Sequence, residues 1–445
     1  MKHPVLIIVF CITMAASGMA QQKDTTASFS LQEAINYAQK HQVSILNAQI
    51  DEEIAKNTVK KTIGIGLPQV SANASFQDFL KVPTSLLPGD FFGEPGTFVP
   101  VKFGVKYNSV IGLEASQLLF DGSYLVGLKA SRTYKELSVK NTGRSKIETT
   151  VAVTKAYYAV LVSNEQLALI DANLDRLKKT LNDTEQMFKN GFVEKIDVDR
   201  LSVLLNNLTT ERENVIRLLA LNVNLLKFQM GMTVGSMLTL KDKIDDVKID
   251  QVQVLADGQS FNKRIEYSLL QTQKKLNELD IKRYKSVFLP SLAAFGSTSA
   301  NFQNDKFAKL YDNRFPTTLI GLKLSIPLVS GGQKLYDLRN AKLESLKTDN
   351  NLTNLENAIE LEVSQAQTTY LNGQKSLENQ KRNMELAKEV LRVTKIKYEQ
   401  GVGSSLEVTT AETALKEAQN NYITALYDML INKVNLDKAL GNINY

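Results

Sequence analysis

Apolar residues recur at helical spacing over several long stretches of the chain. Along each stretch they alternate steps of three and four positions, which is the seam of a heptad pattern. The positions between them carry polar residues such as Asn, Lys, Glu and Thr, as a helix with its other faces in water requires. The pattern predicts long antiparallel helical hairpins. The seam residues are Leu167, Ile170, Leu174, Leu177 and Leu181, then Leu201, Leu204 and Leu208, and in the second half Leu415, Ala418, Tyr422, Ala425 and Met429.

Four shorter stretches alternate apolar and polar residues with a period of two, the pattern of a strand with one apolar and one wet face. The apolar positions are Val70, Ala72, Ala74 and Phe76 in the first stretch and Leu322, Leu324, Ile326 and Leu328 in the last. We expect strands at about 68–80, 105–120, 290–303 and 317–329, each with the length of a tilted membrane-spanning β-strand. The connections Val82 to Val101, rich in Pro and Gly, and Asn304 to Pro316 are expected to be irregular loops.

From Gly112 to Gly231 the first half of the chain matches the second half at an offset of 209 or 210 positions, which indicates a tandem repeat. Two of the matching pairs are Ile111-Gly112-Leu113 with Ile320-Gly321-Leu322, and Phe188-Lys189-Asn190-Gly191 with Tyr398-Glu399-Gln400-Gly401. Each half has the plan helix, strand, loop, strand, very long helix, turn, helix. We therefore expect repeat 1 over 21–235 with its helical turn near 190–194, a linker over 236–257, and repeat 2 over 258–445 with its turn near 400–404.

The first 20 residues have the layout of a secretory signal peptide, with Lys2, an apolar run from Val5 to Met14 and small residues up to Ala20. A membrane anchor is the alternative, but the run is well below the ~20 apolar residues that a span requires. Cys11, the one cysteine in the sequence, lies in this segment, so we expect a mature chain without disulfides or reactive thiols. After Met14 no apolar run approaches spanning length, so strands are the elements expected to enter a membrane.

Composition excludes several classes of function. The net charge of +6 is spread as mixed signs along helical stretches, and tryptophan is absent, which does not fit a nucleic-acid footprint. His41 is the one histidine outside the signal segment, so a multi-histidine metal site is not expected. An exported hydrolase is an alternative, but no spacing indicates a nucleophile elbow, a metal cluster or paired carboxylates. We therefore expect no enzymatic activity, no catalytic residues, no metal site and no cofactor.

The number of strands predicts oligomerisation. Four strands cannot close a membrane barrel, since the smallest have ~8 strands. An open sheet in lipid leaves backbone groups unpaired, at a cost of several kcal/mol each. If these strands enter a membrane, several chains must contribute to one barrel. The alternative is two strand hairpins packed on a soluble helical domain.

This duplicated plan resembles the TolC-like outer-membrane efflux proteins, the outer-membrane factors of tripartite efflux or type I secretion systems, from about Ser28 to Tyr445. The resemblance rests on the helix-to-strand junctions, on the segments where the second strand of each repeat leads back into the long helix, and on the turns of the helical hairpins. The residues that carry it are Leu67-Pro68, Leu289-Pro290, Phe120-Asp121-Gly122, Val329-Ser330-Gly331-Gly332, Phe188 to Asp199 and Tyr398 to Thr409.

The resemblance implies a mixed α/β membrane protein with four transmembrane β-strands per chain. Three chains would form a homotrimeric 12-stranded β-barrel in the cell outer membrane, continued by a long antiparallel α-helical coiled-coil tunnel in the periplasm. The implied function is an exit duct for efflux or secretion, with a periplasmic adaptor and an inner-membrane transporter as partners. The alternative is a periplasmic coiled-coil scaffold or adaptor without its own pore.

The resemblance also implies functional residues at the two helical turns. Around these turns lies the periplasmic mouth that receives the adaptor, although turn geometry alone is an alternative role for the two glycines. The contact candidates are Gly191, Phe192, Val193, Gly401, Val402, Gly403 and Ser404. Glycine suits a helix reversal, because the reversal needs a positive φ angle.

The family's mouth is narrowed by carboxylates, and Glu407 matches the first such position. Three copies of Glu407 would form a ring that attracts cations. The next acidic position of the family is Thr410 here, and a latch arginine corresponds to Gly403. Asp197 and Tyr398 match another latch pair, although Asp197 has an alternative role as a carboxylate favoured in the first turn of a helix.

Overall fold

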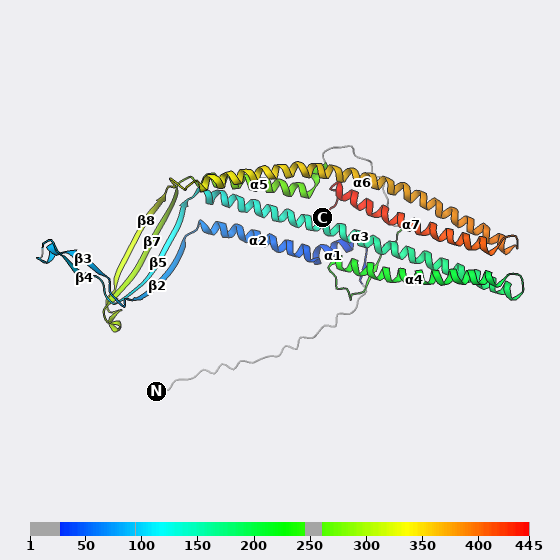
Figure 1. Cartoon of the computed structure of the whole chain (residues 1–445), viewed down its shortest axis with the longest axis horizontal. Helices are drawn as coiled ribbons and strands as arrows, with labels where there is room; N and C mark the ends of the chain where they lie inside the picture. Colours follow the sequence, from blue (N-terminus) through cyan, green and yellow to red (C-terminus); the bar gives the residue numbers. More distant parts are fainter. Residues whose placement is uncertain (1–26, 94, 245–259, 445) are drawn as a thin grey trace, which may run out of the picture. The chain divides into compact units, whose positions relative to one another are not determined.

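The computed structural model describes residues 27–93, 95–244 and 260–444 and is mostly helical with some sheet (Figure 1). The expected signal peptide and most of the expected linker lie outside these residues. The chain divides into two compact units, one from Met1–Ala38, Val153–Asp250 and Leu386–Ile423, the other from Gln39–Ala152, Gln251–Glu385 and Thr424–Tyr445. Among the described residues, no helix combines the length and the apolar composition needed to cross a membrane.

The elements of the first half recur in the second half in the same order and with similar lengths. The two longest helices have 68 and 67 residues, about 100 Å each at 1.5 Å per residue. The first set is α2 (Val43–Ile65), β2 (Gln69–Asp78), β5 (Tyr107–Phe120), α3 (Gly122–Lys189) and α4 (Lys195–Met230). The second set is α5 (Ile265–Ser286), β7 (Ser291–Asn304), β8 (Phe315–Ser325), α6 (Gln333–Glu399) and α7 (Ser405–Ala439).

In the first unit, α4 and the end of α3 form an antiparallel pair around an apolar core. The buried core residues are Ile170, Leu174, Leu177, Leu201, Leu208 and Val215, with Leu167, Leu181, Leu204 and Leu205 packed against them. These positions confirm the heptad seam predicted for this pair. Because they repeat every three and four residues, they form one stripe on each helix.

Two short strands that the sequence did not predict also belong to the first unit. β1 (Ala27–Phe29) pairs in parallel with β6 (Leu238–Leu240), and α1 (Leu31–His41) follows β1 directly. The buried Tyr157 hydroxyl donates to the Phe29 carbonyl at 3.0 Å and to Asp242 Oδ2 at 2.8 Å. Burial is the main cause that raises the pKa of Tyr157, and the adjacent Asp242 raises it further. The hydroxyl therefore remains a neutral donor.

Asp242 also accepts a hydrogen bond from the Leu31 backbone N–H at 2.8 Å, which satisfies a free donor at the start of α1. Nearby, Lys241 forms an ion pair with Glu33 at 2.7 Å. These contacts fix the start of α1 to β6, and we call them the β1–β6 clamp.

The second unit contains a four-stranded sheet with the order β2-β5-β7-β8, and every neighbouring pair is antiparallel (Figure 1). Residues opposite each other on neighbouring strands lie on the same face of the sheet. For example, Ala115 of β5 is opposite Gly296 of β7, which is opposite Ile320 of β8. β2 and β8 are the edge strands, and each is paired on one side only.

One face of this sheet is mainly apolar and the other is mainly polar, although Ser109, Gln117 and Thr298 lie on the first face and Val110, Phe295 and Leu319 on the second. The register places on the apolar face Val70, Ala72, Ala74, Phe76, Ile111, Leu113, Ala115, Ala294, Gly296, Ala300, Ile320, Leu322 and Leu324. On the polar face it places Gln69, Ser71, Asn73, Ser75, Glu114, Ser116, Ser297, Ser299, Asn301, Thr317 and Lys323. The period-two alternation read from the sequence therefore corresponds to two chemically different surfaces.

The segment expected as an irregular loop between β2 and β5 is instead ordered, and that expectation was wrong. β3 (Thr84–Pro88) and β4 (Phe98–Lys102) form an antiparallel hairpin, joined in part by a short 3-10 helix (Gly89–Phe92). The high content of Pro and Gly concealed the strands, because these residues are depleted in strands in general. We call residues 84–102 the apolar hairpin.

Helices of the second unit are joined by polar contacts. Lys140 Nζ of α3 donates to Thr272 Oγ1 of α5 at 2.6 Å, and Asn277 Nδ2 of α5 donates to Thr348 Oγ1 of α6 at 2.7 Å. Gly122 begins α3, and a Cβ there would lie 2.9 Å from the end of the Leu289 side chain, so a larger residue where β5 turns into α3 would displace that side chain.

Candidate functional site

The first helical turn lies between α3 and α4. Gly191 adopts a positive φ of 79°, and the N–H of Phe192 donates to the Met187 carbonyl at 2.9 Å. This is the geometry by which a glycine ends a helix. Val193 is partly buried, whereas Phe192 is 80% exposed, so an aromatic side chain projects from the turn into solvent.

The second turn, between α6 and α7, has the same geometry. Gly401 has a φ of 74°, and the N–H of Val402 donates to the Lys397 carbonyl at 3.0 Å. Val402 is 79% exposed, the counterpart of Phe192. Gly403 is held closely, since a Cβ there would lie 3.0 Å from the Tyr398 backbone nitrogen.

Glu407 and Ser404 lie at the start of α7. The hydroxyl of Ser404 accepts a hydrogen bond from the Glu407 N–H at 3.3 Å, as an N-terminal helix cap does. The Glu407 side chain is acidic, in the first turn and exposed. Its carboxylate is therefore accessible to solvent at this turn.

Asp197 and Tyr398 have different partners. Asp197 accepts a hydrogen bond from the buried Ser405 hydroxyl and forms a capping box with Glu194 at the start of α4. The buried Tyr398 hydroxyl lies 3.4 Å from Thr184 Oγ1. Each residue thus joins one helical hairpin to the other. Asp197 also lies in the first turn of α4, the position of the alternative role considered from the sequence.

A partly buried ion pair reinforces this link between the hairpins. Arg176 of α3 donates to both carboxylate oxygens of Glu412 on α7, at 3.0 and 2.8 Å. Arg176 also donates to Asn173, whose amide bonds to Gln419 of α7. The sequence did not predict these partners, because residues more than 230 positions apart share no local pattern.

The polar face of the sheet carries two charges that the sequence analysis did not single out. Glu114 of β5 and Lys323 of β8 both lie on this face and are exposed. The alternation in β5 and β8 could have identified them, because each is the charged residue among the polar positions of its strand. A water-filled channel beside this face would pass both charges.

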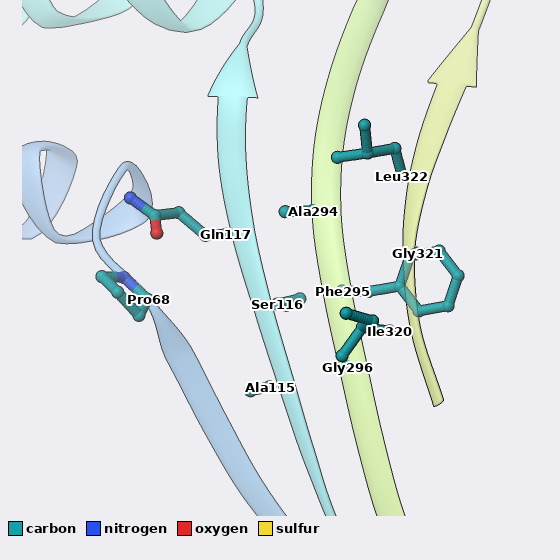
Figure 2. A pocket seen from close by; sticks show the side chains of 10 residues that line it. All are labelled: Pro68, Ala115, Ser116, Gln117, Ala294, Phe295, Gly296, Ile320, Gly321 and Leu322. Carbon is teal, nitrogen blue, oxygen red and sulfur yellow. The ribbon is translucent and has the colours of Figure 1, made fainter. Parts of the chain in front are cut away.

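The apolar face has a shallow hollow where small residues meet across β5, β7 and β8. Figure 2 shows Ala115 of β5, Ala294 and Gly296 of β7, and the larger Ile320 and Leu322 of β8 among its lining residues. None of its lining residues is titratable. The hollow can therefore take an apolar group, but its lining offers no acid or base.

Within the described ranges, no group of three or more His, Cys, Asp or Glu side chains is placed to hold a metal ion. The polar residues of the two turns are engaged in caps and in contacts between helices. The two turns thus present exposed apolar side chains, and Glu407 presents an exposed carboxylate.

Comparisons with known proteins agree with this geometry. A family model described as outer membrane efflux protein matches residues 264–442. The efflux pump outer membrane protein TtgC of Pseudomonas putida is 22% identical over 76% of this chain and 69% of its own length. TolC of Salmonella enteritidis is 24% identical over 84% of this chain and 78% of its own length.

Among solved structures, CusC superimposes with a TM-score of 0.76 at 16% identity, covering 93% of this chain and 92% of CusC. This likeness extends the similarity from the second half of the chain to almost all of it, so the fold is that of these outer membrane channels. Together, residues 264–442 match the outer membrane efflux protein family, and the chain as a whole is similar in sequence and in fold to TolC-like exit ducts of the outer membrane.

Proposed function

We propose that three copies of the chain form one duct, in which the four-stranded sheets join into a twelve-stranded barrel. The observation that carries this proposal is the sheet itself, which has one apolar face and two unpaired edges, β2 and β8. Backbone groups left unpaired in lipid cost several kcal/mol each. Pairing β8 of one copy with β2 of the next removes both edges at once.

The two faces of the sheet support the same arrangement. Apolar side chains such as Ile320 and Leu322 would contact lipid, and Glu114 and Lys323 would line the water-filled interior. The reverse orientation would bury both charges in lipid, at about 2–4 kcal/mol for a lysine at the bilayer midplane. The duct carries its cargo passively, without a catalytic step.

The partners of this duct are a periplasmic adaptor and an inner-membrane transporter that provides the energy. The exposed Phe192 and Val402 support an adaptor contact, because an apolar side chain projecting from a rigid turn is suited to enter a pocket of another protein. Gly191, Val193, Gly401, Gly403 and Ser404 shape the two turns that present them.

The periplasmic mouth is narrowed by Glu407, three copies of which surround the axis and favour cations. Asp197 and Tyr398 contribute through their bonds to Ser405 and Thr184, which hold the two helical hairpins of one copy together. Opening the mouth requires the helices to separate, and these contacts oppose that separation.

Membrane fractionation followed by native mass measurement in mild detergent tests the proposal. We expect the protein in the outer-membrane fraction as a species of three times the chain mass, which heating in SDS converts to monomer. Recovery as a monomer or a dimer under conditions that preserve a control outer-membrane trimer would contradict the shared barrel. Recovery from the soluble periplasmic fraction would favour a scaffold without a pore.

A further inference from the structure

The apolar hairpin has an unusual surface for a segment outside the sheet. Large apolar side chains on both strands and on the connecting turn point into solvent, where Phe91 is 79% and Phe98 is 68% exposed. The exposed large apolar residues are Leu86, Phe91, Phe92 and Phe98. Across residues 84–102 the sequence contains only three charged residues, Asp90, Glu94 and Lys102. An exposed apolar patch of this kind marks an interaction surface.

Within the described residues, no further strand extends the apolar hairpin. β3 and β4 pair only with each other and are not hydrogen-bonded to the four-stranded sheet (Figure 1). An isolated two-stranded hairpin is at best marginally stable in water. The apolar side chains therefore need a cover that the single chain does not provide.

Lipid is a poor cover for this hairpin. Each of its two strands has an outer edge whose backbone groups have no partner strand. Burying such edges in hydrocarbon costs several kcal/mol per unpaired group. Addition of a strand from another protein is also disfavoured, because Pro88 and Pro100 lie in the strands and proline resists edge pairing. What remains is packing of side chains against protein, with the backbone edges in water.

The position of the apolar hairpin next to β2 indicates which protein covers it. β2 is an edge strand, and the hairpin begins at Thr84, shortly after β2 ends at Asp78. If copies join through β2 and β8, each hairpin stands at the boundary with the next copy. The loop end of the sheet also carries an aromatic cluster of Phe76, Tyr107 and Phe307, with ring centroids 5.6–6.2 Å apart. Aromatic side chains mark the level of a membrane interface, so the hairpin lies beyond it.

We propose that the apolar hairpins of the three copies pack against one another over the outer mouth of the duct, through Phe91, Phe92 and Phe98. Their contact forms an apolar constriction, which restricts the passage of ions because a narrow apolar passage loses its water. This inference rests on the proposed trimeric duct and adds a second gate, at the mouth facing away from the periplasm.

Single-cysteine crosslinking tests the contact. A disulfide needs Cα atoms about 4.4–6.8 Å apart, so it reports direct packing between copies. We expect mild oxidation of intact cells to convert Phe91→Cys into disulfide-linked dimers, since one of three equivalent cysteines has no partner. The matched control is Asn313→Cys, an exposed position in the loop between β7 and β8, which should remain uncrosslinked. The wild type controls for Cys11.

Two further measurements separate the possible outcomes. The triple variant Phe91→Ser, Phe92→Ser, Phe98→Ser should raise single-channel conductance in planar bilayers, whereas Leu80→Ser, an exposed apolar residue before the hairpin, should not. A trimer in which Phe91→Cys fails to crosslink and reacts fully with a water-soluble maleimide would overturn the hairpin contact alone. Labelling of the hairpin by a photoactivatable lipid would overturn it in favour of lipid. A monomeric protein would overturn both the duct and the hairpin contact.

Discussion

The two turns show how single residues determine the ends of the longest helices. Gly191 and Gly401 both have φ near 75–80°, a conformation that costs other L-residues about 1–2 kcal/mol. Space is not the limitation at either position, since an added Cβ would meet no atom within 4 Å. The backbone angle alone therefore accounts for glycine here.

Gly401→Ala should lower the free energy of unfolding by about 1 kcal/mol through this backbone strain. Thermal denaturation of the detergent-extracted protein would measure the change. Gly127→Ala is the matched control, since Gly127 lies within α3 with open space around it and alanine is the better helix former. Equal effects at both positions would contradict a role for the positive φ angle.

Glu407→Gln should reduce the preference of the duct for cations, because it removes a negative charge at the start of α7 without changing the length of the side chain. Reversal potentials in asymmetric KCl across a planar bilayer would measure the selectivity. Glu399→Gln, at the exposed end of α6, is the control. An unchanged reversal potential for Glu407→Gln would remove this residue from the constriction.

At the residue scale, the sequence predicted positions better than partners. Gly191 and Gly401 could be placed in turns from the sequence because turn motifs are local, whereas the role of Glu407 in a constriction stays a prediction. The Ser405 partner of Asp197 and the Thr184 partner of Tyr398 could not be identified, because these contacts depend on how two separate helical hairpins align.

At the scale of elements, the partly buried ion pair between α3 and α7 gives the sharpest prediction. Glu412 is 6% exposed, so removing Arg176 leaves a nearly buried carboxylate without its partner. Arg176→Leu should cost about 3 kcal/mol, and the double variant with Glu412→Leu should recover most of this. Midpoints of denaturation in detergent would measure both.

The control for this pair is Arg217→Leu. Its partner Glu213 lies 3.7 Å away on the same helix, and both side chains are more than 60% exposed. An exposed pair contributes at most about 1 kcal/mol, so little change is expected. A loss as large as that of Arg176→Leu would mean that burial does not determine the cost.

The β1–β6 clamp should be sensitive to acid. The hydrogen bond from Lys241, followed by that from the Ser30 backbone, holds the pKa of Glu33 below its ordinary value. Because the pKa of Glu33 is lower in the folded than in the unfolded chain, its ionised carboxylate stabilises the fold at pH values above the ordinary pKa. This stabilisation is lost as the pH falls through the lowered pKa of the folded state. Hydrogen exchange over residues 27–41, corrected for intrinsic rates, should therefore increase in that acidic range. Lys241→Met should abolish the additional pH dependence, and its persistence would exclude the Glu33–Lys241 pair as the cause.

Elements with long periodic patterns were predictable, and short ones were not. The heptad seam around Leu174 extends over many turns of helix, so its signal accumulates. β1 and β6 have three residues each and pair across more than 200 positions, which leaves no periodicity to read. The strands of the apolar hairpin are short and contain proline, so neither length nor composition indicated them.

At the scale of the whole molecule, the two faces of the sheet predict opposite responses at neighbouring positions. Ile320→Lys places a charge on the apolar face, at a cost of about 2–4 kcal/mol in lipid. Leu319→Lys places the same charge on the polar face, next to Ser297, where water is present. We expect the first variant to reduce the amount of SDS-resistant trimer in the outer membrane and the second to leave it nearly unchanged. Equal trimer levels would contradict the proposed orientation of the sheet.

The two open edges of the sheet have a genetic consequence. A chain with an intact β2 and a defective β8 can still join a growing ring, but it prevents the ring from closing. Since every duct draws its copies from one pool, such a chain also disables the normal copies that it meets. An allele of this kind should therefore be dominant. In cells that express both forms, the fraction of export that is lost should exceed the fraction of chains that are defective.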